Sequence, residues 1–219
     1  VSVSAQSISY KLGMSKPQNH YFEVEMELSD FKNATLDLKL PVWAPGSYLV
    51  REFASKIDLV RATDDKGKSL PINKVDKNTW RVETKKAKKI TVKYEVYSFE
   101  LTVRTSFLDL THGYVNGTSV FMYVDGFKHL PGNLTVIPYE TFKKVTTALP
   151  RRNDGLASDN EFYYTFNDYD QLVDCPIEIG NQVEFTFMAA GIPHHVAMYG
   201  EANYDIERLK FDMAKIVES

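Results

Sequence analysis

The sequence has little cysteine, no long apolar run and no strong excess of either charge. Its 219 residues include one cysteine, Cys175, so the chain can form neither an internal disulfide nor a CxxC metal knuckle. No run approaches the roughly 18 consecutive apolar residues of a membrane span. A net charge of −3 offers no basic face for a phosphate backbone. We therefore expect neither a membrane span nor a nucleic-acid partner.

Motifs for a self-contained catalytic site are also missing. The sequence contains no HExxH for zinc, no GxSxG for a nucleophilic serine, and no GxGxxG or GxxxxGK[ST] for phosphate. Ser47 follows a glycine but lacks the second one, and Cys175 has no histidine near it in sequence, which favours a buried, apolar role. A hydrolase built on Ser47 or Cys175 is the weakest hypothesis.

The five histidines do not form a metal-binding pattern. His194 and His195 are adjacent, so in a strand they point to opposite faces and cannot share one ion. We expect one to pack and the other to face solvent. No metal site is predicted in this chain.

What the sequence does contain is alternation of apolar and polar residues. In HYFEVEMEL, Phe22, Val24, Met26 and Leu28 fall on one side of a strand and glutamates on the other. Such strands must bury one face against another layer. The sequence predicts a mainly β fold, an antiparallel two-layer sandwich or saddle-like domain.

Turns between the predicted strands have recognisable signals. DDKGK predicts a hairpin at Gly67, where positive φ is available, and a second hairpin turn is expected at the lysine-rich stretch 85–89. TWRVET, KKITVKYEVYSF and TVRTSFLDL are expected to be strands around it.

Helical patterns occur in two places near the end. DYDQLVD predicts a short helical turn near 170–174, capped by its aspartates. A helix near 204–218 is predicted from the apolar stripe Ile206, Leu209 and Met213, with Asn203 or Asp205 as N-cap. This helix has no following partner for its apolar stripe.

Five motifs together carry a family resemblance. LPVWAPGSYLVREFA, DKNTWRVE, VKYEVYSFELTVR, THGYVNGTSVFMYVDG and DYDQLVDCPIEIG occur in this order over nearly the whole chain. Their order and spacing resemble the N-terminal region of the glycyl aminopeptidase family of zinc metallopeptidases. A single one of these motifs would be far less specific.

The resemblance implies a larger protein. It implies an N-terminal β domain at 1–178, and at 179–219 the opening strands and first helix of a truncated thermolysin-like catalytic domain, followed in the family by a PDZ-like domain. Zinc and its HExxH motif belong to the catalytic domain, so this chain alone is expected to hold no cofactor and to be inert. The parent is expected to remove N-terminal residues, glycine or other small ones, from peptides.

Within the resemblance, one loop is the candidate for contact with substrate. Tyr114, Asn116 and Gly117 of HGYVNGTS are expected to line the cleft, with the missing catalytic domain of the same polypeptide and a peptide as partners. The alternative for this loop is a tight hairpin between core strands.

The stretch LPVWAPGSYLVREF has a structural interpretation. Pro45 and Gly46 turn the chain, Trp43 and Tyr48 are expected to pin it into the core, and Arg51 is expected to pair with a carboxylate or with backbone carbonyls.

Two further hypotheses remain open. One is a free-standing β-sandwich module that binds peptide or carbohydrate, with Tyr114, Phe121 and Tyr123 as its platform. The other concerns location: VSVSAQ resembles the end of a signal peptide, which favours a periplasmic or secreted protein.

Overall fold

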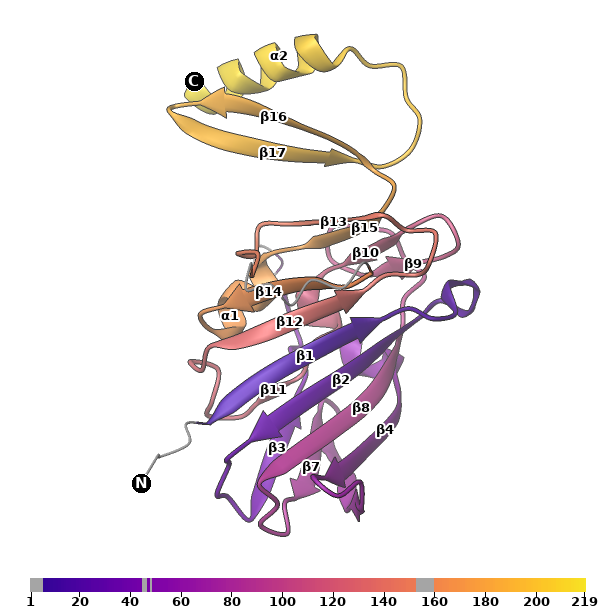
Figure 1. The fold of residues 1–219 in the computed structure, drawn as a ribbon, viewed down its shortest axis with the longest axis vertical. Coiled ribbons are helices and arrows are strands. Elements are labelled where there is room, and N and C mark those ends of the chain that lie inside the picture. Colours follow the sequence, from indigo (N-terminus) through magenta and orange to yellow (C-terminus); the bar gives the residue numbers. More distant parts are fainter. Residues whose placement is uncertain (1–5, 45–46, 48, 153–159) are drawn as a thin grey trace.

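A computed structural model describes residues 6–44, 47, 49–152 and 160–219 (Figure 1). Val3 and Ala5 of the signal-like start, Pro45, Gly46 and Tyr48 lie outside the described residues. The mainly β fold is confirmed, with several antiparallel sheets and a C-terminal helix.

The largest sheet has seven strands and forms one layer. In spatial order its strands are β14 (Phe162–Phe166), β12 (Gly132–Ile137), β1 (Ser7–Gly13), β2 (Tyr21–Ser29), β8 (Lys89–Tyr97), β4 (Ile57–Asp64) and β5 (Ser69–Leu70). All neighbours are antiparallel except β1 and β12, which run parallel.

Two smaller sheets complete the main body. The first consists of β11 (Tyr123–Val124), β3 (Thr35–Lys39), β7 (Thr79–Glu83) and β6 (Ile72–Asp76), and it lies behind the large sheet in Figure 1. The second consists of β13 (Lys144–Thr147), β15 (Ile177–Gly180), β10 (Gly113–Val115) and β9 (Phe107–Leu108). Short 3₁₀ turns lie at η1 (Pro17–Asn19), η2 (Phe53–Lys56) and η3 (Gly117–Ser119).

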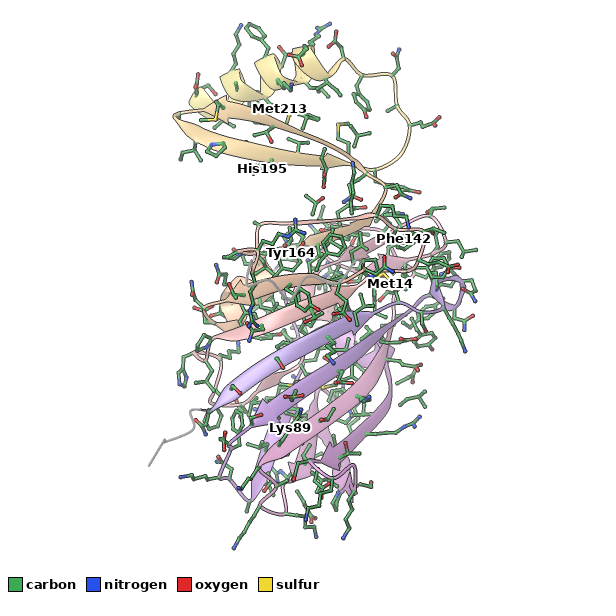
Figure 2. The ribbon with its side chains drawn as sticks, in the orientation of Figure 1. Met14, Lys89, Phe142, Tyr164, His195 and Met213 are labelled. Atoms are coloured by element: carbon green, nitrogen blue, oxygen red, sulfur yellow. The ribbon has the colours of Figure 1, made fainter. Side chains whose placement is uncertain are left out.

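The predicted alternation is confirmed in β2. Phe22, Val24, Met26 and Leu28 are all buried in one core shared by the sheets. The opposite face is polar: Glu25 lies 2.8 Å from Lys93 and 3.8 Å from Lys11 across the neighbouring strands. Lys89 lies on this outer face too (Figure 2). The charged face is therefore a solvated surface and the apolar face holds the layers together.

Buried tyrosines satisfy the backbone of the fully buried segment 120–122. Tyr94 donates to Val120 O at 2.9 Å, and Tyr10 donates to Met122 O at 2.6 Å. Tyr169 donates to Phe121 O at 2.7 Å. Because a buried carbonyl without a partner is costly, these hydroxyls allow a non-strand segment to cross the core.

Two strand predictions are wrong. The lysine-rich turn at 85–89 does not close a hairpin, because β7 and β8 belong to different sheets. Lys85 and Lys86 both take positive φ, 49° and 60°, and carry the chain from one layer to the other. In TVRTSFLDL only Phe107–Leu108 forms a strand. By contrast, Gly67 turns β4 into β5 with a φ of 75°, as predicted.

Both predicted helices are present. The short α1 (Tyr169–Asp174) begins at Asp168, whose side chain accepts from Gln171 N. The terminal α2 (Ile206–Glu218) begins at Asp205, whose carboxylate accepts from Glu207 N and Arg208 N. Among the described residues, no helix is long and apolar enough to cross a membrane.

The last part of the chain forms a unit above the main body (Figure 1). It consists of the hairpin β16 (Val183–Ala189) and β17 (Ile192–Met198) with α2 beside β16. Only Phe187 and Ala189 are buried in the stretch 183–219. Met213 of α2 and His195 of β17 belong to this thin layer (Figure 2).

Candidate functional site

The candidate site lies on the four-stranded sheet β13-β15-β10-β9, on the face turned away from the core. Glu178 of β15 has Tyr114 of β10 as its register partner on one side and Thr146 of β13 on the other. Directly paired residues project from the same face of a sheet. The neighbours Ile177 and Ile179 point the other way and are fully buried.

Glu178 is an incompletely satisfied carboxylate. Its Oε1 is buried and has no hydrogen-bond partner among the described residues, and the side chain is 18% exposed. Burial raises the pKa of the Glu178 carboxyl to about 7. Such a group is expected to hold a proton or a cation at neutral pH.

Gln182 lies beside it with a similar deficit. Its Nε2 donates to Thr146 Oγ1 at 2.7 Å, while its Oε1 is buried without a partner. Glu178 and Gln182 thus each leave one buried acceptor oxygen without a donor among the described residues. The site has spare capacity to accept hydrogen bonds.

His112 is the nearest titratable group to Glu178. Its Nε2 lies 4.0 Å from Glu178 Oε1, too far for a hydrogen bond. Burial lowers the pKa of His112, although the charge of Asp109 acts in the opposite direction. The ring is therefore neutral at pH 7 and does not balance the carboxylate.

Tight packing holds the His112 ring in place. It stacks on Tyr199 with 3.5 Å between ring centroids, and lies 5.0 Å from Phe107. A Cβ at Gly180 would come within 3.1 Å of His112 Cβ, so glycine is favoured at that position. Because Tyr199 directly follows β17, this stack brings the C-terminal unit into contact with His112.

The three predicted cleft residues come together but differ in surroundings. Tyr114 is half-buried beside Glu178, and burial together with the charge of Glu178 raises its pKa. Asn116 is engaged as N-cap of η3: its Oδ1 accepts from Thr118 N, and its Nδ2 donates to Val103 O at 2.9 Å. Gly117 is buried, and a Cβ there would lie 2.7 Å from Val173 Cα. Their contact with substrate stays a prediction.

The alternative of a tight hairpin is correct for the first half of this loop and wrong for the second half. β9 and β10 pair antiparallel across residues 109–112, with Leu108 opposite Gly113. After β10 the chain enters η3 and the buried segment 120–122, and β10 and β11 lie in different sheets. The aromatic platform of a free-standing binding module fails in part as well, because Phe121 is 0% exposed. Tyr123 is half-buried, with Lys128 Nζ 4.4 Å from its ring centroid.

The stretch 40–53 departs from its predicted role. Trp43 is 52% exposed, so it does not pin the crossover into the core. Nε of Arg51 is buried without any hydrogen-bond partner among the described residues, so the expected pairing is also wrong. Ser47 is buried and bridges to Ala44.

The other nucleophile and metal candidates are weak. Cys175 is half-buried against the core, and burial raises the pKa of its thiol, which makes it a poor nucleophile. His194 stacks on Phe187 while His195 is exposed, as predicted for neighbours in a strand. In the part of the chain that the structure describes, no group of three His, Cys, Asp or Glu could hold a metal ion.

Sequence reasoning missed Glu178 and Gln182. Alternation in PIEIG assigns Glu178 to the outer face of a strand, and outer-face glutamates are ordinarily solvated. His112, which lies beside Glu178, and Tyr199, which stacks on His112, are distant from Glu178 in sequence. The signal available was a single acidic residue between two isoleucines in a motif of the resemblance.

Comparisons with known proteins identify the family. Residues 9–181 match the family described as the peptidase M61 N-terminal domain. The chain is also similar to a crystal structure of an aminopeptidase N family protein from Idiomarina loihiensis, with 33% sequence identity and a TM-score of 0.88. The match covers 96% of this chain and 35% of that one, so the chain spans about a third of the length of this relative. No curated protein matches the sequence. The chain belongs to the family of peptidase M61 N-terminal domains.

Proposed function

We propose that the chain is the non-catalytic N-terminal part of a zinc aminopeptidase, and that its outer β10–β15 face walls the substrate cleft. Residues 1–178 would form the supporting β domain. Residues 179–219 would open a thermolysin-like catalytic domain whose remainder lies outside these 219 residues. The parent would remove N-terminal residues, glycine or other small ones, from peptides.

Glu178 is the observation that carries the proposal. A buried carboxylate oxygen without a donor is costly, and an ammonium group supplies both the missing charge and the missing donors. The amino end of a peptide, with a pKa of about 8, is protonated at neutral pH. Tyr114 and His112 place aromatic rings beside the same carboxylate, and such rings favour a cation.

Selectivity follows from the same arrangement. The amino end would ionise Glu178 when it binds, since a neighbouring positive charge lowers a carboxyl pKa. A peptide with a blocked amino end brings no charge and would leave Glu178 unsatisfied. A wall of this kind restricts the cleft to free amino ends, which is what an exopeptidase requires.

The C-terminal unit supports a continuation into a second domain. In the described residues neither β16 nor β17 has another strand beside it, and an unprotected two-stranded sheet is marginal in water. Its apolar surface is considerable; the exposed residues are Val183, Met188, Ile192, Tyr199, Phe211, Ile216 and Val217. Further strands and helices would cover these side chains.

Zinc does not fit this chain's own residues. Because no described group could hold a metal ion, its ligands would belong to the rest of the protein. Glu178, Tyr114 and Gln182 would bind and orient a substrate and would not transfer its protons.

Activity of the full-length protein tests the proposal. Aminoacyl p-nitroanilides of Gly, Ala, Leu and Phe should be hydrolysed, with the small residues preferred, and a zinc chelator should abolish the activity. The 219-residue chain should hydrolyse none of them and bind no stoichiometric zinc. If the full-length protein hydrolysed N-acetylated substrates as fast as substrates with a free amino end, aminopeptidase activity would be ruled out.

A further inference from the structure

A second feature of the main body has no role in the site above. A pocket of about 510 Å³ opens between residues 49–53, the end of β8 and two buried serines. Ser106 and Ser119 form its hydrogen-bonded pair, with 2.7 Å between their hydroxyl oxygens. Leu49, Val50 and Phe99 stand at its lining.

Arg51 is the unusual group in this pocket. Its backbone N–H donates to Val42 O at 2.6 Å, which fixes the residue in the loop. Its side chain has no ion pair among the described residues, and its Nε is buried without an acceptor. An arginine cannot lose its proton, so this position has an unmet need for an anion.

The other charged groups of the pocket do not meet that need. Glu52 pairs with Lys77 at 3.3 Å and is 65% exposed on its side chain. Lys56 adds a second cation, with its Nζ 5.4 Å from the ring centroid of Tyr97. Glu100 is exposed and makes no ion pair with Arg51.

The rim of the pocket is apolar and exposed. The two loops that border it carry six large apolar side chains at 51–74% exposure: Trp43, Leu49, Val50, Phe99, Leu101 and Val103. The 99–105 loop is held in shape, since Thr105 Oγ1 donates to Glu100 O at 2.6 Å and Asn116 Nδ2 to Val103 O at 2.9 Å. One exposed apolar residue is ordinary, but a group of this size on two neighbouring loops marks an interface.

We propose that this surface, called here the Arg51 surface, docks another domain of the same polypeptide through an acidic side chain flanked by apolar residues. The carboxylate would pair with the guanidinium and the apolar neighbours would cover the rim. The length of the solved relative points to this occupant, because the match covers 96% of this chain and only 35% of that one. The rest of a protein of that length would supply a domain large enough to cover the Arg51 surface.

The inference rests on the proposed function, because it requires a longer protein. It adds the place of contact and the chemistry of the partner. Different side chains line the Arg51 surface and surround Glu178, so the two proposals can fail independently.

Cysteine labelling in the full-length protein tests the coverage. Val50→Cys and Val103→Cys would be placed singly in a Cys175→Ala background, with Val75→Cys on β6 as the matched control. The parent side chains are 68%, 74% and 49% exposed in this chain. Labelling by a maleimide is read at each position by peptide mass spectrometry, so other cysteines do not interfere.

We expect positions 50 and 103 to label at least roughly tenfold more slowly than position 75 in the full-length protein, because a docked face opens only transiently. Equal or faster labelling at 50 and 103 would overturn the inference. Protection that disappears on dilution would overturn it too, since the cover would then be a second copy.

Arg51→Met tests the carboxylate. Losing a charge-assisted hydrogen bond should speed labelling at position 103 by roughly 10- to 100-fold, and Arg51→Lys should restore part of the protection. Unchanged protection in Arg51→Met would exclude the acidic partner. If Arg51→Met does not fold, the three cysteine variants still decide whether the surface is covered. If positions 50 and 103 label as fast as position 75 in an enzyme that still selects free amino ends, the docking surface is wrong and the proposed function stands.

Discussion

Glu178 Oε1 lies 4.0 Å from His112 Nε2, and the two side chains neither share a hydrogen bond nor neutralise each other. Burial acts on both, raising the pKa of the acid and lowering that of the base. The pair is therefore neutral at the low end of physiological pH and leaves an acceptor open. This is the state expected of an empty cation-binding site.

Glu178→Gln should stabilise the chain at high pH relative to low pH. The pKa of Glu178 is about 7 in the folded chain against an ordinary 4.5, so the unfolded chain loses this proton at lower pH. The wild-type chain therefore loses stability as the pH rises from 4.5 to 7, and the variant does not. Each tenfold change in proton affinity corresponds to about 1.4 kcal/mol. Urea unfolding at pH 5 and pH 8 should show a relative gain of about 2–3 kcal/mol for the variant at pH 8.

Exposed Glu100 supplies the control for that experiment. Glu100→Gln should change stability little at either pH, because the side chain is solvated. An identical pH dependence in wild type and Glu178→Gln would show that Glu178 ionises normally.

Tyr94→Phe should destabilise the fold by about 2–4 kcal/mol. The lost hydroxyl leaves two buried backbone groups unsatisfied, Val120 O and Met122 N, which lie 2.9 and 3.0 Å from it. Tyr21→Phe is the matched control, since its hydroxyl bonds exposed Asp58. Equal, small effects in both variants in chemical denaturation would contradict the role assigned to the buried tyrosines.

Gly117→Ala should destabilise the chain by about 1–3 kcal/mol, since its Cβ would lie 2.7 Å from the Cα of Val173 in α1. The backbone of α1 at Val173 cannot shift without a cost in stability. Gly67→Asn, at an open turn with a φ of 75°, should be tolerated because asparagine adopts that conformation. Thermal unfolding of both variants checks the difference; a neutral Gly117→Ala would mean that α1 is not held against η3.

Local sequence patterns predict the helices and strands better than they predict which elements pack together. The strand at Phe22 and the helix that begins at Asp205 follow from periodicity and capping, which act within a few residues. The turn at Lys85 has the composition of a hairpin, but which sheet the next strand joins depends on contacts far along the chain. That choice is tertiary and leaves no local signal.

The candidate site needed the fold. Tyr114 is predicted from its glycine-flanked loop, whereas Glu178 becomes distinctive only when the fold places the buried His112 ring beside it. The sequence predicts that Trp43 pins the crossover into the core, and the side chain is exposed instead. An apolar residue at an interface and one in a core look alike in sequence.

The most direct test of the account is the kinetics of Glu178→Gln in the full-length enzyme. The measurement is the ratio of kcat/KM for a peptide with a free amino end to kcat/KM for its N-acetylated form, with Glu25→Gln on the solvated outer face of β2 as the control. We predict that Glu178→Gln lowers this ratio by about 10- to 100-fold, the value of one charge-assisted hydrogen bond, and that Glu25→Gln leaves it unchanged. A ratio equal to that of the wild type in Glu178→Gln would contradict the claim that this domain receives the amino end of the substrate.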